Sequence, residues 1–248
     1  MEFSTKQAIL DYCNKNGIEI EEDVAQGFEK LSDMLLEFNS HTNVTALKTK
    51  EDIAVKHFAD SLAVLKYDLI KKGAKVVDIG CGAGFPGLPI KILRPDIKIT
   101  FVDSTTKKLK FTSSVAQAFS MTDVETCPDR AEELVVNGKW EKYDVAVSRA
   151  VASLPVLVEL VLPYVKVGGC FVAYKSSVES DLNNKDSELS KALFGIKKLG
   201  GKVEDVLDAS LDVAVDETQK HSLIVIRKMG KTPLEFPRRY AQIVKNPL

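Results

Sequence analysis

The chain has 248 residues, of which 45% are hydrophobic and 28% charged, and this balance excludes collagen-like, coiled-coil and disordered proteins. The formal net charge is −1, so a nucleic acid or an anionic membrane would have to be bound by a local patch. No apolar run reaches the roughly 18 residues that span a bilayer, and the first residues lack the basic start and apolar core of a signal peptide. We therefore expect a cytoplasmic protein without a membrane anchor.

The cysteines are few and widely separated in the sequence. None of them forms a Cys-x-x-Cys pair, which argues against a zinc knuckle and against a disulfide scaffold. The histidines are likewise too few and too dispersed for a metal triad, so we expect no metal site. The residues concerned are Cys13, Cys81, Cys127 and Cys170, and His41, His57 and His221.

The first 72 residues are predicted to form a helical extension. Ser4 or Thr5 can cap a first helix that Gly17 ends. A second helix is expected from about residue 23 to 38, where apolar residues recur at helical spacing. Thr49, with an aspartate three residues later, resembles a capping box and opens a third helix.

From residue 75 onward, short β-branched runs alternate with helical stretches, which indicates a parallel sheet covered by helices on both faces. The last two strands have no helix between them, so we expect an antiparallel hairpin that closes an α/β sheet of about seven strands. Strands are predicted at 76–79, 97–102, 124–127, 145–147, 170–173, 203–207 and 223–226, and helices at 89–93, 107–119, 155–165 and 182–199.

The last 22 residues, 227–248, are strongly basic, with six Lys or Arg against one Glu. Three prolines in this stretch disfavour a long helix. We predict an extended basic arm over 229–248, which follows a helical extension (1–72) and an α/β domain (73–228) in one compact unit. The alternative is that the tail packs back on the sheet, with Pro237 and Tyr240 as anchors.

A glycine-rich loop, Asp78 to Gly87, stands between a predicted strand and a predicted helix. Glycines let the backbone approach a ligand closely and adopt positive φ. In open α/β folds, ligands bind at this carboxyl end of the strands. The loop is therefore predicted to be a ligand site rather than a plain connector.

The choice of ligand depends on the residue before the first glycine. Gly82, Gly84 and Gly87 formally match the dinucleotide fingerprint. However, the carboxylate of Asp78 repels a pyrophosphate and suits a cation such as the sulfonium and ammonium groups of S-adenosylmethionine. Asp-x-Gly-x-Gly-x-Gly after the first strand is typical of Rossmann-like methyltransferases, and we predict S-adenosylmethionine as the cofactor. Asp103 closes the second strand and is predicted to accept hydrogen bonds from ribose hydroxyls, the alternative being a turn residue.

Short motifs occur along nearly the whole chain: Asn39 with Asn43-Val44-Thr45-Ala46, His57-Phe58-Ala59-Asp60-Ser61-Leu62, Phe85-Pro86-Gly87, Asp103-Ser104 with Lys107-Lys108, Arg130-Ala131-Glu132, Ser148-Arg149-Ala150-Val151, Tyr174-Lys175 and Pro237-Arg238-Arg239. In these motifs the chain resembles the glucose-inhibited division protein B (GidB, RsmG) family. Its departures from the usual pattern are Phe38 for a tryptophan, Val44 for a leucine and Ser176 for a glycine. The resemblance implies a Rossmann-like class I methyltransferase, with residues 73–228 as its S-adenosylmethionine-binding domain, that makes N7-methylguanine in bacterial 16S ribosomal RNA.

The resemblance also implies roles for single residues. Gly80 and Phe85 are expected to line the cofactor, Ala131 and Glu132 to lie at its adenine end, and Arg149 at its methyl-donor end. Each has an ordinary alternative: Phe85 as a core residue, Glu132 as a carboxylate favoured at a helix start, Arg149 as an ion-pair partner.

Methylation at guanine N7 requires little acid–base chemistry from the protein. N7 carries a lone pair and no proton, so we expect no catalytic base. Positioning and electrostatic stabilisation remain as the protein's contributions. His57 and Asp60, three residues apart on the third helix, are predicted either to anchor the extension to the sheet or to lie at the rim of the active site.

RNA binding must depend on local basic residues, with one base flipped out to reach the cofactor. We expect the basic tail to bind RNA and to leave the cofactor site alone. The candidate RNA contacts are Lys107, Lys108, Lys110, Lys175, Arg238 and Arg239.

Two other classes of function stay open: an NAD-dependent oxidoreductase, and an RNA-binding or ribosome-assembly protein with a vestigial pocket. The first would need a group for hydride chemistry, such as a Tyr-x-x-x-Lys pair or a placed histidine, and neither Tyr164 nor Tyr174 has a lysine four residues later. We expect the protein to be a monomer.

Overall fold

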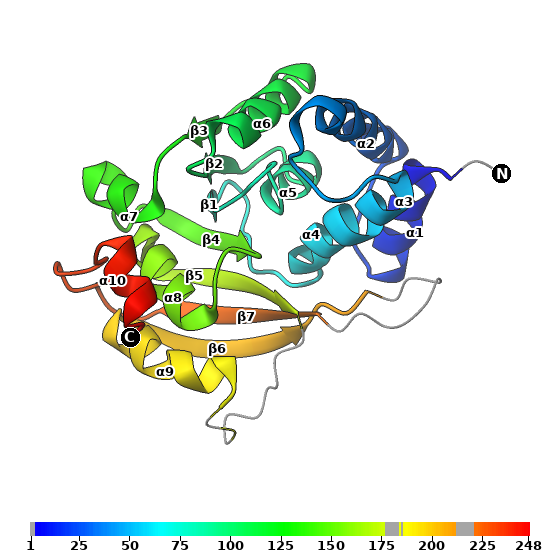
Figure 1. Ribbon diagram of the computed structural model, residues 1–248. Helices are drawn as coiled ribbons and strands as arrows, with labels where there is room; N and C mark the ends of the chain where they lie inside the picture. The colour runs from blue at the N-terminus through cyan, green and yellow to red at the C-terminus, as the bar shows by residue number, and fades with distance from the viewer. Residues whose placement is uncertain (1–2, 177–183, 185, 212–220) are drawn as a thin grey trace.

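The computed structural model describes residues 3–176, 184, 186–211 and 221–248. A seven-stranded sheet with the order β3-β2-β1-β4-β5-β7-β6 forms its centre (Figure 1). All the predicted strands are confirmed, and several are longer than expected. They are β1 (Lys75–Ile79), β2 (Lys98–Val102), β3 (Val124–Cys127), β4 (Tyr143–Arg149), β5 (Val165–Ser176), β6 (Gly201–Asp208) and β7 (His221–Lys228).

Strand direction determines which residues share an edge of the sheet. The pairs β1–β2, β1–β4, β2–β3 and β4–β5 are parallel, whereas β7 is antiparallel to both β5 and β6. The expected antiparallel hairpin is therefore confirmed, with β7 inserted between β5 and β6. Because β7 runs backwards, its first residue, His221, pairs with Ser176 at the end of β5. One edge of the sheet thus gathers the ends of the parallel strands and the start of β7.

Two hydrophobic cores lie on opposite faces of this sheet, because successive side chains of a strand alternate in direction. In β1, Val76 belongs to the first core and Val77 to the second. The N-terminal extension, α5 (Gly87–Leu93) and α6 (Thr106–Ala118) cover the first face. The second face is covered by α8 (Leu154–Val161) and α9 (Glu188–Lys198). The extension therefore shares its core with the sheet.

The extension consists of α1 (Thr5–Lys15), α2 (Glu22–Thr42) and a composite third helix. The predicted caps are confirmed, since Ser4 accepts a hydrogen bond from the Gln7 N–H and Thr49 from the Asp52 N–H. The third helix is less regular than expected, because a π-helical turn interrupts it, a feature frequent at functional sites. Its parts are α3 (Lys50–Ile53), the π turn η1 (Ala54–Ala59), α4 (Asp60–Leu62) and the 3₁₀ turn η2 (Ala63–Lys66).

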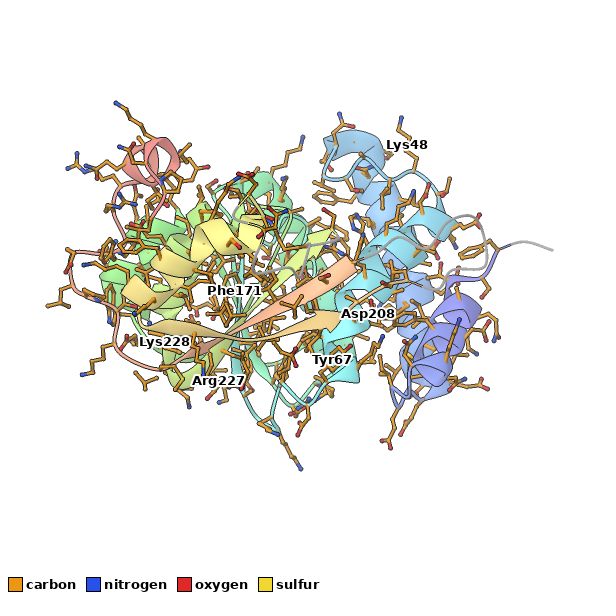
Figure 2. All side chains as sticks on the ribbon, turned by 90° about the horizontal axis from the view of Figure 1, so that it is seen from below. Lys48, Tyr67, Phe171, Asp208, Arg227 and Lys228 are labelled. Atoms are coloured by element: carbon orange, nitrogen blue, oxygen red, sulfur yellow. The ribbon has the colours of Figure 1, made fainter. Side chains whose placement is uncertain are left out.

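A hydrogen bond joins the end of the extension to β6, the outermost strand of the sheet. The Tyr67 hydroxyl donates a hydrogen bond to the carbonyl of Asp208 at the end of β6, 2.7 Å away (Figure 2). The described part of the chain contains no helix long and apolar enough to cross a bilayer.

Two predicted helices need correction, and three short ones were not expected. The helix predicted over 155–165 ends at residue 161, because Pro163 directs the chain into a 3₁₀ turn, η4 (Leu162–Tyr164), before β5. The helix predicted over 182–199 begins only at residue 188, and 182, 183 and 185 lie outside the described residues. The additional elements are α7 (Ala131–Leu134), the π turn η3 (Val135–Lys139) and α10 (Tyr240–Lys245).

The C-terminal segment corrects the prediction of an extended arm. The segment folds back onto α8 and ends in α10 (Figure 1). Arg238 forms a two-pronged ion pair with Glu159 of α8, at 2.6 and 2.9 Å. Glu159 is fully buried, and Phe236 and Ile243 on either side join the second core. The prolines do exclude a long helix, but they leave enough apolar side chains to dock the segment.

Fewer basic side chains of this region can offer their charge to RNA than its composition suggests. Arg227 pairs with Glu204 at 2.6 Å, and Lys228 is buried, with its Nζ 2.8 Å from the Leu162 carbonyl (Figure 2). Together with Arg238, half of the basic residues counted over 227–248 serve the fold. The division of the chain at residues 72 and 228 stays a prediction.

Replacing Arg238 with Ala is expected to lower the free energy of unfolding by about 3 kcal/mol, because Glu159 would keep a buried charge without its charged partner. The exposed neighbour offers a matched control, and Arg239→Ala should change the same quantity by less than about 0.5 kcal/mol. Urea denaturation followed by circular dichroism measures both. Equal unfolding free energies for the two variants would contradict this role of Arg238.

Candidate cofactor and substrate cleft

The glycines of the loop between β1 and α5 have different tasks. Gly80, Gly82 and Gly84 all have positive φ, between +58° and +89°. A Cβ on Gly80 would collide with Val151, and one on Gly84 with Leu88. A Cβ on Gly82 would meet no atom within 4 Å. Gly80 and Gly84 are therefore required by the packing of the loop, whereas Gly82 borders open space where a ligand can lie.

Asp78, in β1, contacts the far end of this loop. Its side chain is fully buried and Oδ2 accepts a hydrogen bond of 2.8 Å from the Gly87 N–H. Oδ1 is a buried acceptor without a partner among the described residues, and burial raises the pKa of this carboxyl to about 7. Asp78 is not among the residues that line the cavities of about 760 and 390 Å³ beside this loop, and its role toward a bound cation stays a prediction. Its hydrogen bond fixes the start of α5.

Asp103 follows β2 and contacts the same loop. Its Oδ2 accepts a hydrogen bond of 2.9 Å from the Gly82 N–H, and its Oδ1 one of 2.8 Å from the Thr105 N–H. Asp103 also lines a cavity of about 390 Å³ at the carboxyl edge of the sheet. The turn role and the ligand role considered for Asp103 are therefore compatible in this structure.

Two cavities meet along the carboxyl edge of the sheet, at the switch point where β1 lies between β2 and β4. The larger, of about 760 Å³, lies between the glycine loop and the extension. The smaller, of about 390 Å³, follows the ends of β2, β3 and β4. They share Gly80, Lys108 and Ala150, so they form one continuous cleft.

The structure distributes most of the predicted cofactor residues between these cavities. Gly80, Gly82, Phe85 and Arg149 line the larger one. The smaller one is lined by Asp103, Ala131 and Glu132 as well as Gly80. The Tyr164 hydroxyl donates a hydrogen bond of 2.6 Å to the Ala131 carbonyl and so holds the start of α7. Gly84 lines neither cavity.

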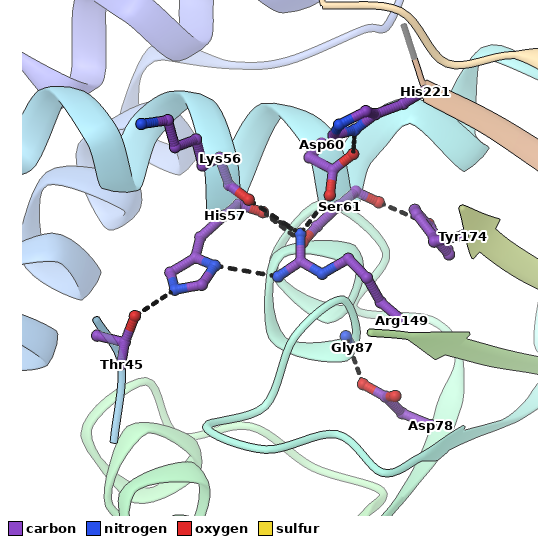
Figure 3. A network of polar contacts seen from close by, with 10 residues as sticks. All are labelled: Thr45, Lys56, His57, Asp60, Ser61, Asp78, Gly87, Arg149, Tyr174 and His221. Atoms are coloured by element: carbon purple, nitrogen blue, oxygen red, sulfur yellow. Dashed lines mark hydrogen bonds and ion pairs between the residues drawn. The ribbon is translucent and has the colours of Figure 1, made fainter. Parts of the chain in front are cut away.

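Arg149, the last residue of β4, is the centre of a polar network (Figure 3). Its Nη1 lies 2.6 Å from Asp60 Oδ2, and its Nη2 lies 3.1 Å from His57 Nδ1. Asp60 Oδ1 in turn contacts His221 Nδ1 at 2.7 Å, and His57 Nε2 contacts the Thr45 hydroxyl at 2.8 Å. The network joins the extension to β4 and β7.

This network answers the question left open for His57 and Asp60. Both residues anchor the extension to the sheet, and both also line the larger cavity, together with Arg149 and His221. Tyr174 adds a further link, because its hydroxyl donates a hydrogen bond of 2.8 Å to the Ser61 carbonyl. Anchoring and proximity to the site are therefore properties of the same side chains.

The network also determines the protonation states of His57 and Asp60. Burial and the positive charge of Arg149 lower the pKa of His57 to about 3, so its imidazole is neutral at physiological pH. A guanidinium only donates, so Nδ1 of His57 accepts and Nε2 donates to Thr45. The ring stacks on Phe85 with centroids 4.4 Å apart. Burial favours the neutral form of Asp60, but the contacts with His221 and Arg149 outweigh it and lower its pKa.

The predicted RNA contacts differ in position. Lys108 lines both cavities, and Lys175 lines the larger one with its Nζ 2.6 Å from Glu188 Oε1. Lys107 and Lys110 are exposed on α6 and lie outside the two cavities. Arg238 is in its ion pair with Glu159, and Arg239 is exposed.

Sequence reasoning missed His221 as a site residue. It lies 161 positions from Asp60, and no local motif marks it. Only the reversed direction of β7 brings it to the carboxyl edge of the sheet. In the described ranges, no three His, Cys, Asp or Glu side chains are grouped to hold a metal ion.

The pKa of His57 leads to a test by pH. In the unfolded chain the imidazole of His57 takes up a proton near pH 6.5, whereas in the folded protein it does so only near pH 3. The contribution of neutral His57 to the free energy of unfolding is therefore complete above pH 6.5 and is lost as the pH falls. His57→Gln should flatten the fall in unfolding free energy between pH 6.5 and about 4.5, by up to about 1.4 kcal/mol per pH unit. Denaturation across this range measures it, with His41→Gln as the exposed control. Parallel profiles for wild type and His57→Gln would speak against a buried neutral imidazole.

The chain is similar to known proteins both in sequence and in fold. Chains named ribosomal RNA small subunit methyltransferase G from Acetivibrio thermocellus and Clostridium novyi are both 39% identical to this chain, over 100% and 97% of its length and 98% and 96% of theirs. Among solved structures, precorrin-6y C5,15-methyltransferase from Geobacter metallireducens GS-15 matches with a TM-score of 0.50 and 17% identity, over 69% of this chain and 87% of its own.

The structure of M. jannaschii TYW2 in complex with AdoMet matches with a TM-score of 0.53 and 11% identity, over 69% of this chain and 74% of its own. At such identities these structures establish the fold, which is that of Rossmann-like class I methyltransferases. The model of the GidB family, described as rRNA small subunit methyltransferase G, matches residues 24–204. The chain belongs to the GidB family.

Proposed function

We propose that this protein transfers a methyl group from S-adenosylmethionine to N7 of a guanine in the 16S RNA of the small ribosomal subunit. The observation that carries the proposal is the cleft of a GidB-family chain, lined by Gly82, Asp103 and Arg149 at the switch point of the sheet. The names of the 39% identical relatives support methylation of small-subunit ribosomal RNA. We propose that the protein acts in the cytoplasm, as a monomer.

The residues of the cleft fit this cofactor. The open space beside Gly82 suits the methionine portion, which needs a close approach of the backbone. The carboxylate of Asp103 suits the ribose hydroxyls, and Ala131 and Glu132 the adenine end. When bound, S-adenosylmethionine supplies an electrophilic methyl group.

The protein contributes positioning rather than proton transfer. Guanine N7 has no proton to lose, so no residue has to act as a base. Neutral His57 and the paired Arg149 and Asp60 form a fixed wall of the larger cavity, where one flipped-out base would be held in line with the methyl group. Lys108, at the junction of the two cavities, suits a phosphate of the same RNA strand, and the exposed Lys107 and Arg239 suit more distant ones.

The two other functions make different demands on the cleft. An NAD-dependent oxidoreductase needs a group for hydride chemistry, and neither Tyr164 nor Tyr174 belongs to a Tyr-x-x-x-Lys pair. Both ring nitrogens of His57 are engaged, by Arg149 and by Thr45. A vestigial pocket would not need to keep the space beside Gly82 clear and Asp103 in place. Binding of S-adenosylhomocysteine without binding of NADH would separate the methyltransferase from the oxidoreductase.

Methyl transfer from radiolabelled S-adenosylmethionine tests the proposed function directly. Small ribosomal subunits, free 16S RNA and transfer RNA serve as substrates in parallel. We expect label in subunits or 16S RNA, as N7-methylguanine identified by nucleoside chromatography, and none in transfer RNA. Label at another atom of guanine would contradict the N7 assignment. Absence of label from both ribosomal substrates would contradict the ribosomal assignment.

Gly82→Asp tests the cofactor site. Asp tolerates the left-handed backbone of this position better than most residues, and its side chain meets open space, so the variant should fold. Calorimetry should show at least about a hundredfold weaker binding of S-adenosylhomocysteine, because the side chain enters the ligand's space. Gly17→Asp is the matched control, since Gly17 has φ +67° and also meets no atom within 4 Å. Unchanged affinity in a folded Gly82→Asp protein would refute the assignment of the loop.

A further inference from the structure

The C-terminal segment reaches the cofactor cleft. Tyr240, the first residue of α10, lines the smaller cavity together with Asp103, Ala131 and Glu132. Its side chain is 40% exposed, so it stands at the surface of the cavity and not in the core. A residue eight positions before the last one therefore lies beside the ends of β2 and β3.

Buried contacts on both sides of Tyr240 hold the segment there. Before it, Arg238 is bound to the buried Glu159, and its backbone N–H also donates to that carboxylate, at 2.8 Å. After it, Ile243 is fully buried in the second core. The last residue, Leu248, packs against Gly195 of α9, where an added Cβ would lie 2.9 Å from the leucine. The position of Tyr240 is thus fixed by the fold.

Contacts within the cavity wall also restrain the tyrosine ring. The guanidinium of Arg130 lies 5.5 Å from the ring centroid, a cation–π distance. Arg130 is itself 3.7 Å from the Glu132 carboxylate, at the start of α7. Ring, guanidinium and carboxylate therefore form one chain of contacts along the smaller cavity.

We propose that Tyr240 is part of the adenine-binding end of the cofactor site, so that the C-terminal segment completes this site. The inference rests on the proposed function, since it assumes that an adenosine group occupies the smaller cavity. An adenine ring presents flat aromatic surface, and a tyrosine whose neighbours in the chain are anchored in the fold contributes apolar and aromatic contact to such a surface. The segment expected to leave the cofactor alone would then help to bind it.

Calorimetric binding of S-adenosylhomocysteine and of 5′-methylthioadenosine to the full-length protein tests the proposal. Both ligands contain the adenosine group, and only the first contains the amino acid portion. Tyr240→Ala should raise both dissociation constants by the same factor, about three- to tenfold. Tyr240→Phe should bind both like wild type, because the contact is made by the ring. Tyr240→Leu, which keeps an apolar side chain, should show an intermediate loss with an unchanged melting temperature.

Val244→Ala is the matched control, since Val244 is an exposed residue of the same helix and lies outside the cavity. It should leave both dissociation constants unchanged. Wild-type affinities in folded Tyr240→Ala and Tyr240→Leu proteins would overturn the proposal. It would also be overturned if the loss affected S-adenosylhomocysteine alone, because the ring would then not contact the adenosine half. If the folded wild type bound neither ligand, the proposed function itself would fail, and this inference with it.

Discussion

The ion pair between Arg149 and Asp60 is the contact on which the site depends. The side chains are 12% and 6% exposed, and they join the end of β4 to the π-interrupted helix of the extension. Loss of Asp60 would leave the largely buried guanidinium of Arg149 without its carboxylate, which is far more costly than the loss of a surface pair. The same pair orients His57 and His221 through their ring nitrogens. The extension therefore serves as one wall of the larger cavity because a charge on the sheet holds it there.

A second set of contacts prepares the opposite part of the cleft. Asp78 and Asp103 hold the glycine loop from two sides, through the N–H groups of Gly87 and Gly82. Each carboxylate fixes a backbone amide, so the loop keeps its shape although Gly82 borders empty space. The ion pair of Arg238 does the same for the C-terminal segment beside the smaller cavity. Buried or half-buried charges thus determine the geometry of a cleft whose proposed reaction transfers no proton to the protein.

The success of sequence reasoning varied with the range of the interactions involved. The strands were predictable, because β-branched runs such as 76–79 are a local signal, and so were the caps of Ser4 and Thr49. The glycine loop was recognisable for the same reason. The extended arm was a wrong prediction, because the charge of a segment does not reveal its partners. Arg238 and Glu159 are 79 positions apart, and no sequence motif near either residue predicts their ion pair.

The sequence by itself determined the alternation of strands and helices, the position of the glycine loop and the family, since each depends on residues that are neighbours in the chain. Only the tertiary structure decided that His57 and Asp60 meet Arg149, that β7 brings His221 to the same edge, and that Tyr240 lines the cleft. The physical reason is that these contacts join segments 89 to 161 positions apart in the network. Their partners follow from the order and direction of the strands and from the packing of two cores, which no short stretch of sequence contains.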